Sequence, residues 1–297
     1  MMKLANRPVE LGMTSSEEQA TFIRYAREEH RGIGEMVDLG CWLGSTTISL
    51  AKGWRDNPAR RDGEDRRIHA YDRFVWHPTM EPIVAGTELR GRWREGDLFL
   101  DEFERRVAPW RELIEVYPGD LREQDWIGRP IEFLLVDAMK SWELAGRIVR
   151  VFYPHLVPGA SLVVHQDFGH DFTSWIHLLH YRFRDHFALH RDLPHSASTI
   201  FRFLEPIPPE RLELPVSANS FTDEEIEAAF ELSFSLVAER KRPEVAGAKV
   251  MAFYHRNDLD RAGREVERLR REGIAMTGGL LRAARLVREA GKGDSHE

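Results

Sequence analysis

Residues Glu35–Ser49 read EMVDLGCWLGSTTIS and decide the fold that we expect for this chain. The apolar residues around Asp38 predict a short strand, and Ser45 can cap the helix that follows. Gly40 and Gly44 punctuate the turn between the two elements. Glycine lets a backbone approach a ligand closely because it has no Cβ that could collide with it. The order strand, glycine turn and helix is therefore typical of a nucleotide-binding corner.

The spacing of the two glycines distinguishes this turn from two familiar phosphate-binding motifs. The pattern D-x-G-x-x-x-G is neither the G-x-G-x-x-G of dinucleotide folds nor the G-K-[ST] of phosphate-binding loops. Taken by itself, the pattern fits an ordinary strand–turn–helix corner about as well as a ligand site. The segments that follow along the chain have to decide between these interpretations.

Composition is that of an ordinary globular protein. The chain has 297 residues, a length that suits one large α/β domain with an appendage, or two small domains. Its net charge of −7 argues against nucleic-acid binding. A single cysteine, Cys41, excludes an intrachain disulfide and a cysteine-based zinc site. Neither a membrane-length apolar run nor a signal-peptide pattern is found, so we expect a soluble, cytoplasmic protein without membrane partners.

A second strand and an acidic residue follow the glycine turn. Residues 68–71 (IHAY) predict a strand that ends at Asp72. A carboxylate in this place can accept hydrogen bonds from both hydroxyls of a ribose, although it can also cap its own loop. Residues 76–94 then contain Pro, Gly and Trp without a clean period. We expect this segment, at about 75–95, to form an ordered lid over a bound ligand.

Further strands alternate with helices and end in polar residues. Residues 113–117, 131–136 and 161–164 predict parallel strands that deliver, in turn, Asp120, Asp137 and the run His165-Gln166-Asp167. Ligands of open α/β sheets lie outside the carboxyl ends of such strands. Asp120 could alternatively cap a helix over 121–126. Residues 187–190 and 199–203 predict a closing antiparallel pair.

The pattern changes from Thr222 onward to amphipathic helix rich in Arg and Glu. We expect these helices to pack on the sheet or on a second subunit, which would make the protein a homo-oligomer. The predicted organisation is an N-terminal helical segment over 1–34, a central domain over 35–210 and a helical C-terminal extension over 211–297.

In their order along the chain, the strand-end motifs resemble class I S-adenosylmethionine-dependent methyltransferases over roughly residues 36–203. The likeness is to catechol O-methyltransferase and the macrocin-type sugar O-methyltransferases, which carry a bulky residue between the two glycines. The segment YDRF at 71–74 is similar to an FDSF-like segment of the latter. The resemblance implies a Rossmann-like sheet of seven strands, the last one antiparallel, with helices on both faces. It also implies S-adenosylmethionine as cofactor, bound by Asp38, Gly40, Cys41, Trp42, Gly44, Ser45, Asp72, Arg73, Asp120, Leu121 and Asp137.

The segment VDAMKSW at 136–142 resembles the L-D-x-x-K segment of catechol O-methyltransferase. There the Asp binds magnesium and the Lys is the general base, which implies the same roles for Asp137 and Lys140. A lysine that is partly desolvated beside a dication can have a lowered pKa and accept a proton near neutrality. The alternative for Lys140 is a solvated residue in the first turn of a helix.

The fifth strand departs from the metal-dependent relatives, which end it in Asp-Asp or Asp-Asn. Asp137, Gln166 and Asp167 could still form a magnesium site of oxygen ligands. His165 could instead be the general base of a metal-free enzyme, because histidine titrates near neutrality, or could favour manganese, iron or zinc. The H-x-D pattern of an oxygenase iron site is also present, but it belongs to jelly rolls rather than to a chain of alternating strands and helices.

We therefore expect O-methylation of a sugar hydroxyl or a small natural product, with magnesium assistance as one option. Two alternatives stay open. An N-methyltransferase of a small amine would need no metal, because a neutral amine is already nucleophilic. A catalytically silent protein that binds the cofactor would explain the altered acidic pair.

Overall fold

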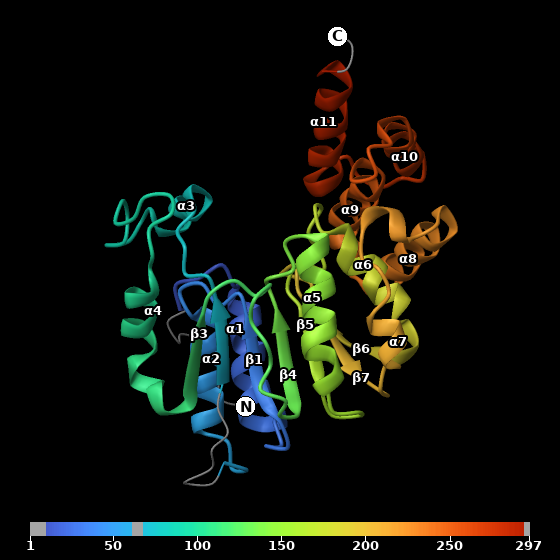
Figure 1. Ribbon diagram of the computed structural model, residues 1–297. Helices are drawn as coiled ribbons and strands as arrows, with labels where there is room; N and C mark the ends of the chain where they lie inside the picture. Colours follow the sequence, from blue (N-terminus) through green and yellow to red (C-terminus); the bar gives the residue numbers. More distant parts are fainter. Residues whose placement is uncertain (1–9, 61–67, 294–297) are drawn as a thin grey trace. The chain divides into compact units, whose positions relative to one another are not determined.

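Seven strands form a mixed sheet in the order β3-β2-β1-β4-β5-β7-β6 (Figure 1). The structure is a computed structural model that describes residues 10–60 and 68–293. The strands are β1 (Glu35–Leu39), β2 (Ile68–Asp72), β3 (Ile114–Pro118), β4 (Ile131–Val136), β5 (Leu162–His165), β6 (Phe187–Asp192) and β7 (Thr199–Phe203). β7, the last in sequence, runs antiparallel to both of its neighbours. The predicted strands, and the antiparallel last one, are confirmed.

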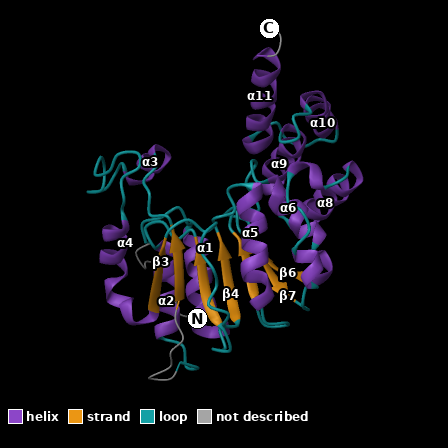
Figure 2. Ribbon diagram, in the orientation of Figure 1, coloured by secondary structure: helices purple, strands orange, loops and turns teal. Residues whose placement is uncertain are grey.

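Helices follow most of the strands (Figure 2). They are α1 (Ser16–Arg24), α2 (Ser45–Arg55), α3 (Glu81–Val84), α4 (Leu100–Val107), α5 (Trp142–Phe152), α6 (Ser174–Arg182), α7 (Pro209–Leu212), α8 (Asp223–Leu236), α9 (Arg242–Tyr254), α10 (Leu259–Arg271) and α11 (Gly278–Gly293). Through the described ranges, no helix combines the length and the apolar character that crossing a membrane requires. Residues 55–67, whose polar sequence with Pro and Gly predicts a solvated loop, lie partly outside the described residues.

The chain forms two compact units, Met1–Leu134 and Leu135–Glu297, which are described one at a time. In the first unit, α1 begins with a capping box, in which Ser15 and Glu18 each satisfy the other's backbone N–H. α1 packs closely on α2, because a Cβ at Gly53 would lie only 2.3 Å from the carbonyl oxygen of Ile23. Glycine therefore lets the two helices approach, which fixes α2 beside the strand that precedes it.

The parallel strands of the first unit bring their carboxyl ends into line. Leu39 lies opposite Tyr71, and Tyr71 lies opposite Tyr117. All five residues of β1 are buried, as expected of a central strand. The turn after β1 and the acid at the end of β2 consequently lie at the same edge of the sheet.

One helix of the first unit was predicted and does not form. Residues 121–126 make a turn followed by irregular backbone. The carboxylate of Asp120 accepts hydrogen bonds from the N–H of Arg122 at 3.0 Å and from its guanidinium. Asp120 therefore caps this turn in the way that it would cap a helix, because a capping side chain accepts from the second or the third N–H. The turn does not continue into a helix, and the indole N–H of Trp126 donates to the carbonyl oxygen of Arg129 at 2.7 Å instead.

The second unit contains one helix that the sequence did not reveal. α6 is buried from Ser174 to His180, on all of its faces. Because every side is covered, its sequence shows no apolar stripe of helical period. α8 to α11 form the helical C-terminal part, in which α9 is buried along most of its length and α11 and α10 pack against it. α8, α10 and α11 agree with the predicted amphipathic segments, whereas α9 is buried from Val245 to Phe253 and is not amphipathic. A role of these helices in oligomerisation remains a prediction.

Candidate functional site

In the turn after β1, three alternate residues have a positive φ angle, which is uncommon. Gly40, Trp42 and Gly44 have φ angles of 94°, 43° and 84°. Glycine adopts this left-handed region without strain, whereas tryptophan does so only when its surroundings hold it there. The N–H of Gly40 donates to the carbonyl oxygen of Tyr71 at 2.8 Å, which ties the turn to β2. The turn is therefore a rigid feature built at the carboxyl end of β1.

Asp72 clamps this turn. Its Oδ2 accepts a hydrogen bond from the N–H of Trp42 at 2.9 Å, and its Oδ1 accepts one from the N–H of Phe74 at 2.7 Å. Burial raises the pKa of Asp72, and these backbone N–H groups act in the opposite direction. The loop-capping role is thus present in the structure. Each carboxylate oxygen keeps a second lone pair that could accept a ribose hydroxyl, so the predicted cofactor role stays open.

Asp38 lies fully buried beneath the same turn. Its Oδ2 accepts hydrogen bonds from the hydroxyls of Thr46 at 2.5 Å and Thr47 at 2.6 Å. These bonds fix the first turn of α2 to β1. Its Oδ1 is buried and has no hydrogen-bond partner in the described part of the chain. Burial raises the pKa of Asp38 to about 6. A buried acceptor without a donor is costly, which indicates a place for a ligand's donor group.

Two further predicted cofactor residues serve the packing of the turn. The Cys41 thiol is buried, and burial raises its pKa well above the ordinary value, so it stays a neutral thiol. The hydroxyl of Ser45 lies 2.6 Å from that of Thr14. Ser45 is therefore held by the N-terminal segment rather than left open to a ligand, although its backbone N–H still lies at the start of α2.

The residues predicted at the ends of β2 and β3 are already engaged. A hydrogen bond from Arg122 holds the pKa of Asp120 down at about 2, so its carboxylate is ionised. The guanidinium of Arg73 lies 3.9 Å from Asp120, and Leu121 is buried. Asp120 therefore belongs to an exposed cluster of charges. An adenine contact by these residues remains a prediction.

The predicted lid segment is ordered and packs on the glycine turn. The indole N–H of Trp42 lies 3.1 Å from the sulfur of Met80, and its ring lies 6.3 Å from that of Trp76. Trp76 and Trp93 are buried, with 2% and 9% of their surface exposed. They therefore form the core of the segment itself and do not line an open acceptor pocket. The segment couples the turn to residues about 40 positions further along the chain.

In the second unit, Lys140 joins two of the residues predicted as magnesium ligands. Its Nζ lies 2.7 Å from Oδ1 of Asp137 and also contacts Oδ2 of Asp167. Burial would lower the pKa of Lys140, but the two carboxylates raise it above its ordinary value. The lowered pKa that we expected for a general base is thus wrong for this arrangement. Lys140 is an ammonium ion.

The predicted magnesium ligands do not fit a metal in this arrangement. Magnesium needs oxygen ligands at about 2.0–2.1 Å in near-octahedral geometry. One oxygen of each carboxylate is already bound to Lys140. Gln166 contributes an amide whose Oε1 is buried without a partner in the described ranges. Among the described residues, no group of three His, Cys, Asp or Glu side chains could hold a metal ion.

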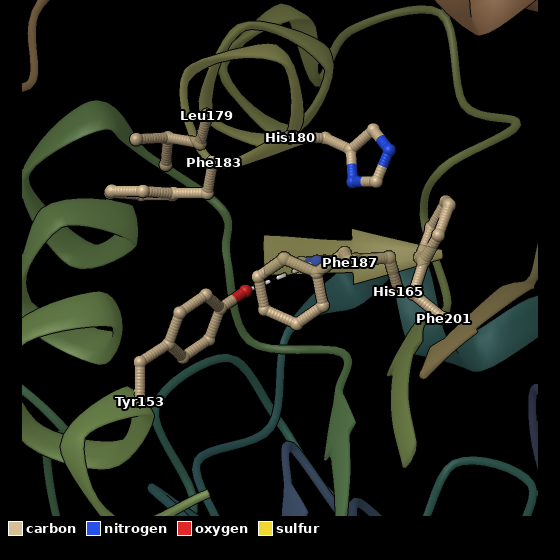
Figure 3. Close-up of a pocket in the computed structure, with 7 residues that line it drawn as sticks. All are labelled: Tyr153, His165, Leu179, His180, Phe183, Phe187 and Phe201. Carbon is tan, nitrogen blue, oxygen red and sulfur yellow. Dashed lines mark hydrogen bonds between the residues drawn. The ribbon is translucent and has the colours of Figure 1, made fainter. Parts of the chain in front are cut away.

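His165 lies in a closed aromatic pocket (Figure 3). Its Nε2 lies 3.2 Å from the hydroxyl of Tyr153, and it is 5% exposed. The cavity beside it is about 10 Å³, room for about one water molecule. The residues that line this cavity are Tyr153, His165, Leu179, His180, Phe183, Phe187 and Phe201. Burial lowers the pKa of His165 to about 4, so the near-neutral value that we expected for a general base is wrong. No acceptor fits in this cavity.

Other histidines that could suggest a metal cluster have separate structural partners. His177 Nδ1 lies 3.0 Å from the hydroxyl of Ser233, and His186 Nε2 lies 2.9 Å from the guanidinium of Arg211. Burial lowers the pKa of His177 to about 3. These imidazoles therefore pack against separate partners.

One residue of the C-terminal helices joins the loops that carry Lys140 and Asp167. His255 stacks on Trp175 with ring centres 5.6 Å apart, and it lies 4.9 Å from the half-exposed ring of Phe172. The indole N–H of Trp175 in turn donates to the carbonyl oxygen of Met139 at 2.8 Å. No local pattern pointed to His255, because it lies 80 positions beyond Trp175, in the turn that follows α9.

Comparisons with known proteins support the fold. No family model matches the sequence, and no curated protein matches it. The solved structure of the O-methyltransferase NovP is similar, with a TM-score of 0.50 and 16% identity over 66% of this chain and 83% of that one. The structure of the calicheamicin methyltransferase CalS11 matches with a TM-score of 0.44 and 15% identity, over 62% of this chain and 76% of that one. The structure of a putative rRNA methylase from Clostridium thermocellum matches with a TM-score of 0.41 and 12% identity, over 66% of this chain and 100% of that one. The likeness to NovP confirms the predicted class I methyltransferase fold.

Proposed function

We propose that this protein transfers the methyl group of S-adenosylmethionine to an oxygen atom of a small molecule, a sugar hydroxyl or a small natural product. The observation that carries the proposal is the turn of Gly40, Trp42 and Gly44, clamped by Asp72 above the buried, unpartnered Oδ1 of Asp38. A close backbone approach and an acceptor without a donor are what a cationic, nucleoside-bearing ligand would use. The fold also supports methyl transfer to oxygen, because the structurally similar protein NovP is named an O-methyltransferase.

The residues of the turn fit the cofactor in chemical type. Asp38 offers a buried carboxylate oxygen to a cationic or N–H donor group, and Asp72 offers the second lone pairs of its two oxygens to a pair of hydroxyls. No side chain of the cap residue Gly44 caps α2, and the N-terminus of a helix favours a carboxylate. When bound, S-adenosylmethionine supplies an electrophilic methyl group, and the electrons of the broken carbon–sulfur bond stay on sulfur.

The charged residues of the second unit suit an acceptor hydroxyl. Asp167 can accept the proton that the hydroxyl loses as its oxygen bonds to the methyl carbon, and can release that proton to solvent. Lys140 can stabilise the negative charge that develops on the oxygen. We derive no step through magnesium, because the carboxylates that should bind it are engaged by Lys140.

Methylation of a small amine is the second candidate. It is favoured by one observation: neither residue predicted as a base is suited to that role, since the pKa of Lys140 is raised and that of His165 is lowered to about 4. A neutral amine needs no base in order to attack the methyl group. Replacing Lys140 by Ala should slow methylation of a hydroxyl but leave methylation of an amine nearly unchanged.

Calorimetric titration of S-adenosylhomocysteine into the purified chain tests the proposal. We expect binding in the micromolar range, which corresponds to about −8 kcal/mol. The activity is then tested with labelled S-adenosylmethionine and a mixture of hydroxyl- and amine-bearing small molecules, with mass spectrometry of the products. Binding without turnover would favour a catalytically silent protein. The absence of binding would refute the proposal.

A further inference from the structure

The position of the Lys140 ammonium is the starting point. Nζ lies 2.7 Å from Oδ1 of Asp137 and contacts Oδ2 of Asp167, so one cation bridges two carboxylates that lie 30 positions apart in the sequence. Both carboxylates are largely buried, with 18% and 15% of their side chains exposed, whereas the lysine side chain is 57% exposed. Two acids that lie together out of water need a cation between them.

The loops that carry these residues are held together by further bonds. The hydroxyl of Thr173 donates to the carbonyl oxygen of Asp167 at 2.8 Å, which closes the loop after β5. The indole N–H of Trp175 donates to the carbonyl oxygen of Met139 at 2.8 Å, which connects that loop to the one after β4. Because Met139 immediately precedes Lys140, the same bond positions the lysine backbone. The bridge is therefore built into the packing of both loops.

Charge decides what the bridge can do. With Lys140 in place, the two carboxylates and one ammonium carry a net charge of −1. A divalent cation could bind both carboxylates only after the lysine withdrew, and the liberated ammonium would then lie close to the dication. Like charges at such a separation repel strongly where water is partly excluded. The lysine thus competes with a metal for the same two oxygens.

We propose that Lys140 is the built-in cation of the acceptor site and takes the place that a divalent metal would otherwise have between Asp137 and Asp167. This inference rests on the proposed function for its catalytic meaning. Lys140 supplies one positive charge beside the acceptor oxygen without a metal. It stabilises a developing oxyanion less than a dication does, so the acceptor suited to this site is an acidic hydroxyl, a phenol or an enol, rather than an alcohol of a sugar.

Manganese binding measures the competition directly, and it needs neither cofactor nor acceptor. Free Mn²⁺ is titrated with the protein and followed by electron paramagnetic resonance. We expect the Lys140→Met variant, which keeps most of the side chain but removes its charge, to bind Mn²⁺ about tenfold or more tightly than the unmodified chain, because the lysine no longer competes with the metal for the two carboxylates. Adding Asp137→Asn to Lys140→Met should abolish the gain.

Two controls separate charge from folding. Lys140→Arg keeps the cation and should leave Mn²⁺ binding as weak as in the unmodified chain. Lys52→Met removes a lysine that binds Glu10 at 2.5 Å in the first unit, and it should change nothing. Calorimetry with S-adenosylhomocysteine reports separately on the cofactor site and hence on the proposed function.

Two results would overturn the inference. If the unmodified chain itself binds Mn²⁺ tightly and Asp137→Asn abolishes that binding, the lysine yields to the metal and does not replace it. If the folded Lys140→Met variant gains no Mn²⁺ affinity, the carboxylates do not form a cation site. The first result is decisive even if Lys140→Met fails to fold, because it needs only the unmodified chain and Asp137→Asn.

Discussion

The backbone N–H of Trp42 donates a 2.9 Å hydrogen bond to Oδ2 of Asp72, and this bond connects the end of β2 to the centre of the glycine turn. Trp42 has a positive φ of 43°, which a residue with a Cβ seldom adopts. The carboxylate therefore stabilises a backbone shape that the sequence around Trp42 would not favour by itself. The same oxygen atoms are the ones that a ribose would contact, so one residue both shapes the turn and offers acceptors.

Replacement of Asp72 by Ala should affect both tasks. Two lost hydrogen bonds to a ribose would weaken binding of S-adenosylhomocysteine by about 2–4 kcal/mol at most. Loss of the acceptor for the N–H groups of Trp42 and Phe74 should also destabilise the fold by about 1–3 kcal/mol. Asp72→Asn retains one carboxylate-like oxygen and should lie between the two. Calorimetry and urea unfolding measure the two effects, and unchanged affinity in a folded Ala variant would exclude the ribose role.

Replacement of Gly40 by Val should abolish cofactor binding. Gly40 has a φ of 94°, and Gly159 has a φ of 70° with no heavy atom within 4 Å of an added Cβ. Val at either position incurs a backbone cost of about 1–2 kcal/mol, so Gly159→Val is a matched control for strain. Only Gly40→Val should block the approach of a ligand. A folded Gly40→Val protein with normal affinity for S-adenosylhomocysteine would refute the site.

Local patterns in the sequence were sufficient for the strands and for the residues at their ends. β2 and β4 are read from short apolar runs, and the acids Asp72 and Asp137 follow from where those runs end. A strand's sequence neighbours fix its end, and parallel pairing then brings the ends of neighbouring strands to one edge. These features depend on residues within a few positions of one another, and such information is present in a single sequence.

The chemistry of the candidate site depends on contacts that are distant in sequence. Whether Lys140 acts as a base or as a cation depends on Asp167, which lies 27 positions away. Whether His165 can act as a base depends on its burial against aromatic side chains of another strand and helix, such as Phe201. Residue types suggested both roles, but the environment sets the pKa values, and a lone sequence does not contain that environment.

The stability of the protein should respond to pH through Asp38. Its folded-state pKa is raised to about 6, whereas an unfolded Asp titrates near about 3.9. The folded state therefore holds a proton that the unfolded state loses, and the stability contributed by Asp38 falls as pH rises from about 4 to about 6. The difference between the two pKa values corresponds to about 3 kcal/mol.

Asp38→Asn isolates this effect, because the amide oxygen can still accept from Thr46 and Thr47 but does not titrate. The unfolding free energy of Asp38→Asn relative to the unmodified chain should rise by about 3 kcal/mol between about pH 4 and about pH 7. Urea unfolding at several pH values measures it. A difference that does not vary with pH would show that Asp38 is not buried as an acid.

His165 should titrate in the opposite sense. Burial lowers its folded-state pKa to about 4, and an unfolded histidine titrates near about 6.5. The unfolded state therefore binds the extra proton, and the stability that His165 contributes is lost as pH falls from about 6.5 to about 4. This change opposes that of Asp38, and burial lowers the pKa values of His177, His180 and His255 as well. The pH dependence of the unmodified chain therefore combines several residues, and each one has to be followed separately.

Proton NMR of the imidazole ring provides that separate measurement. The His165 resonances, assigned by their loss in His165→Asn, should stay constant between about pH 8 and about pH 5.5, and the urea-unfolded chain should show titration near about 6.5 over the same range. A constant signal means that the ring stays neutral because its protonated form would have to be buried in the aromatic pocket. Its conjugate acid is then too strong for an efficient base at neutral pH. Titration of the folded protein near neutrality would instead restore His165 as the general base and remove the argument that the acceptor proton leaves through Asp167.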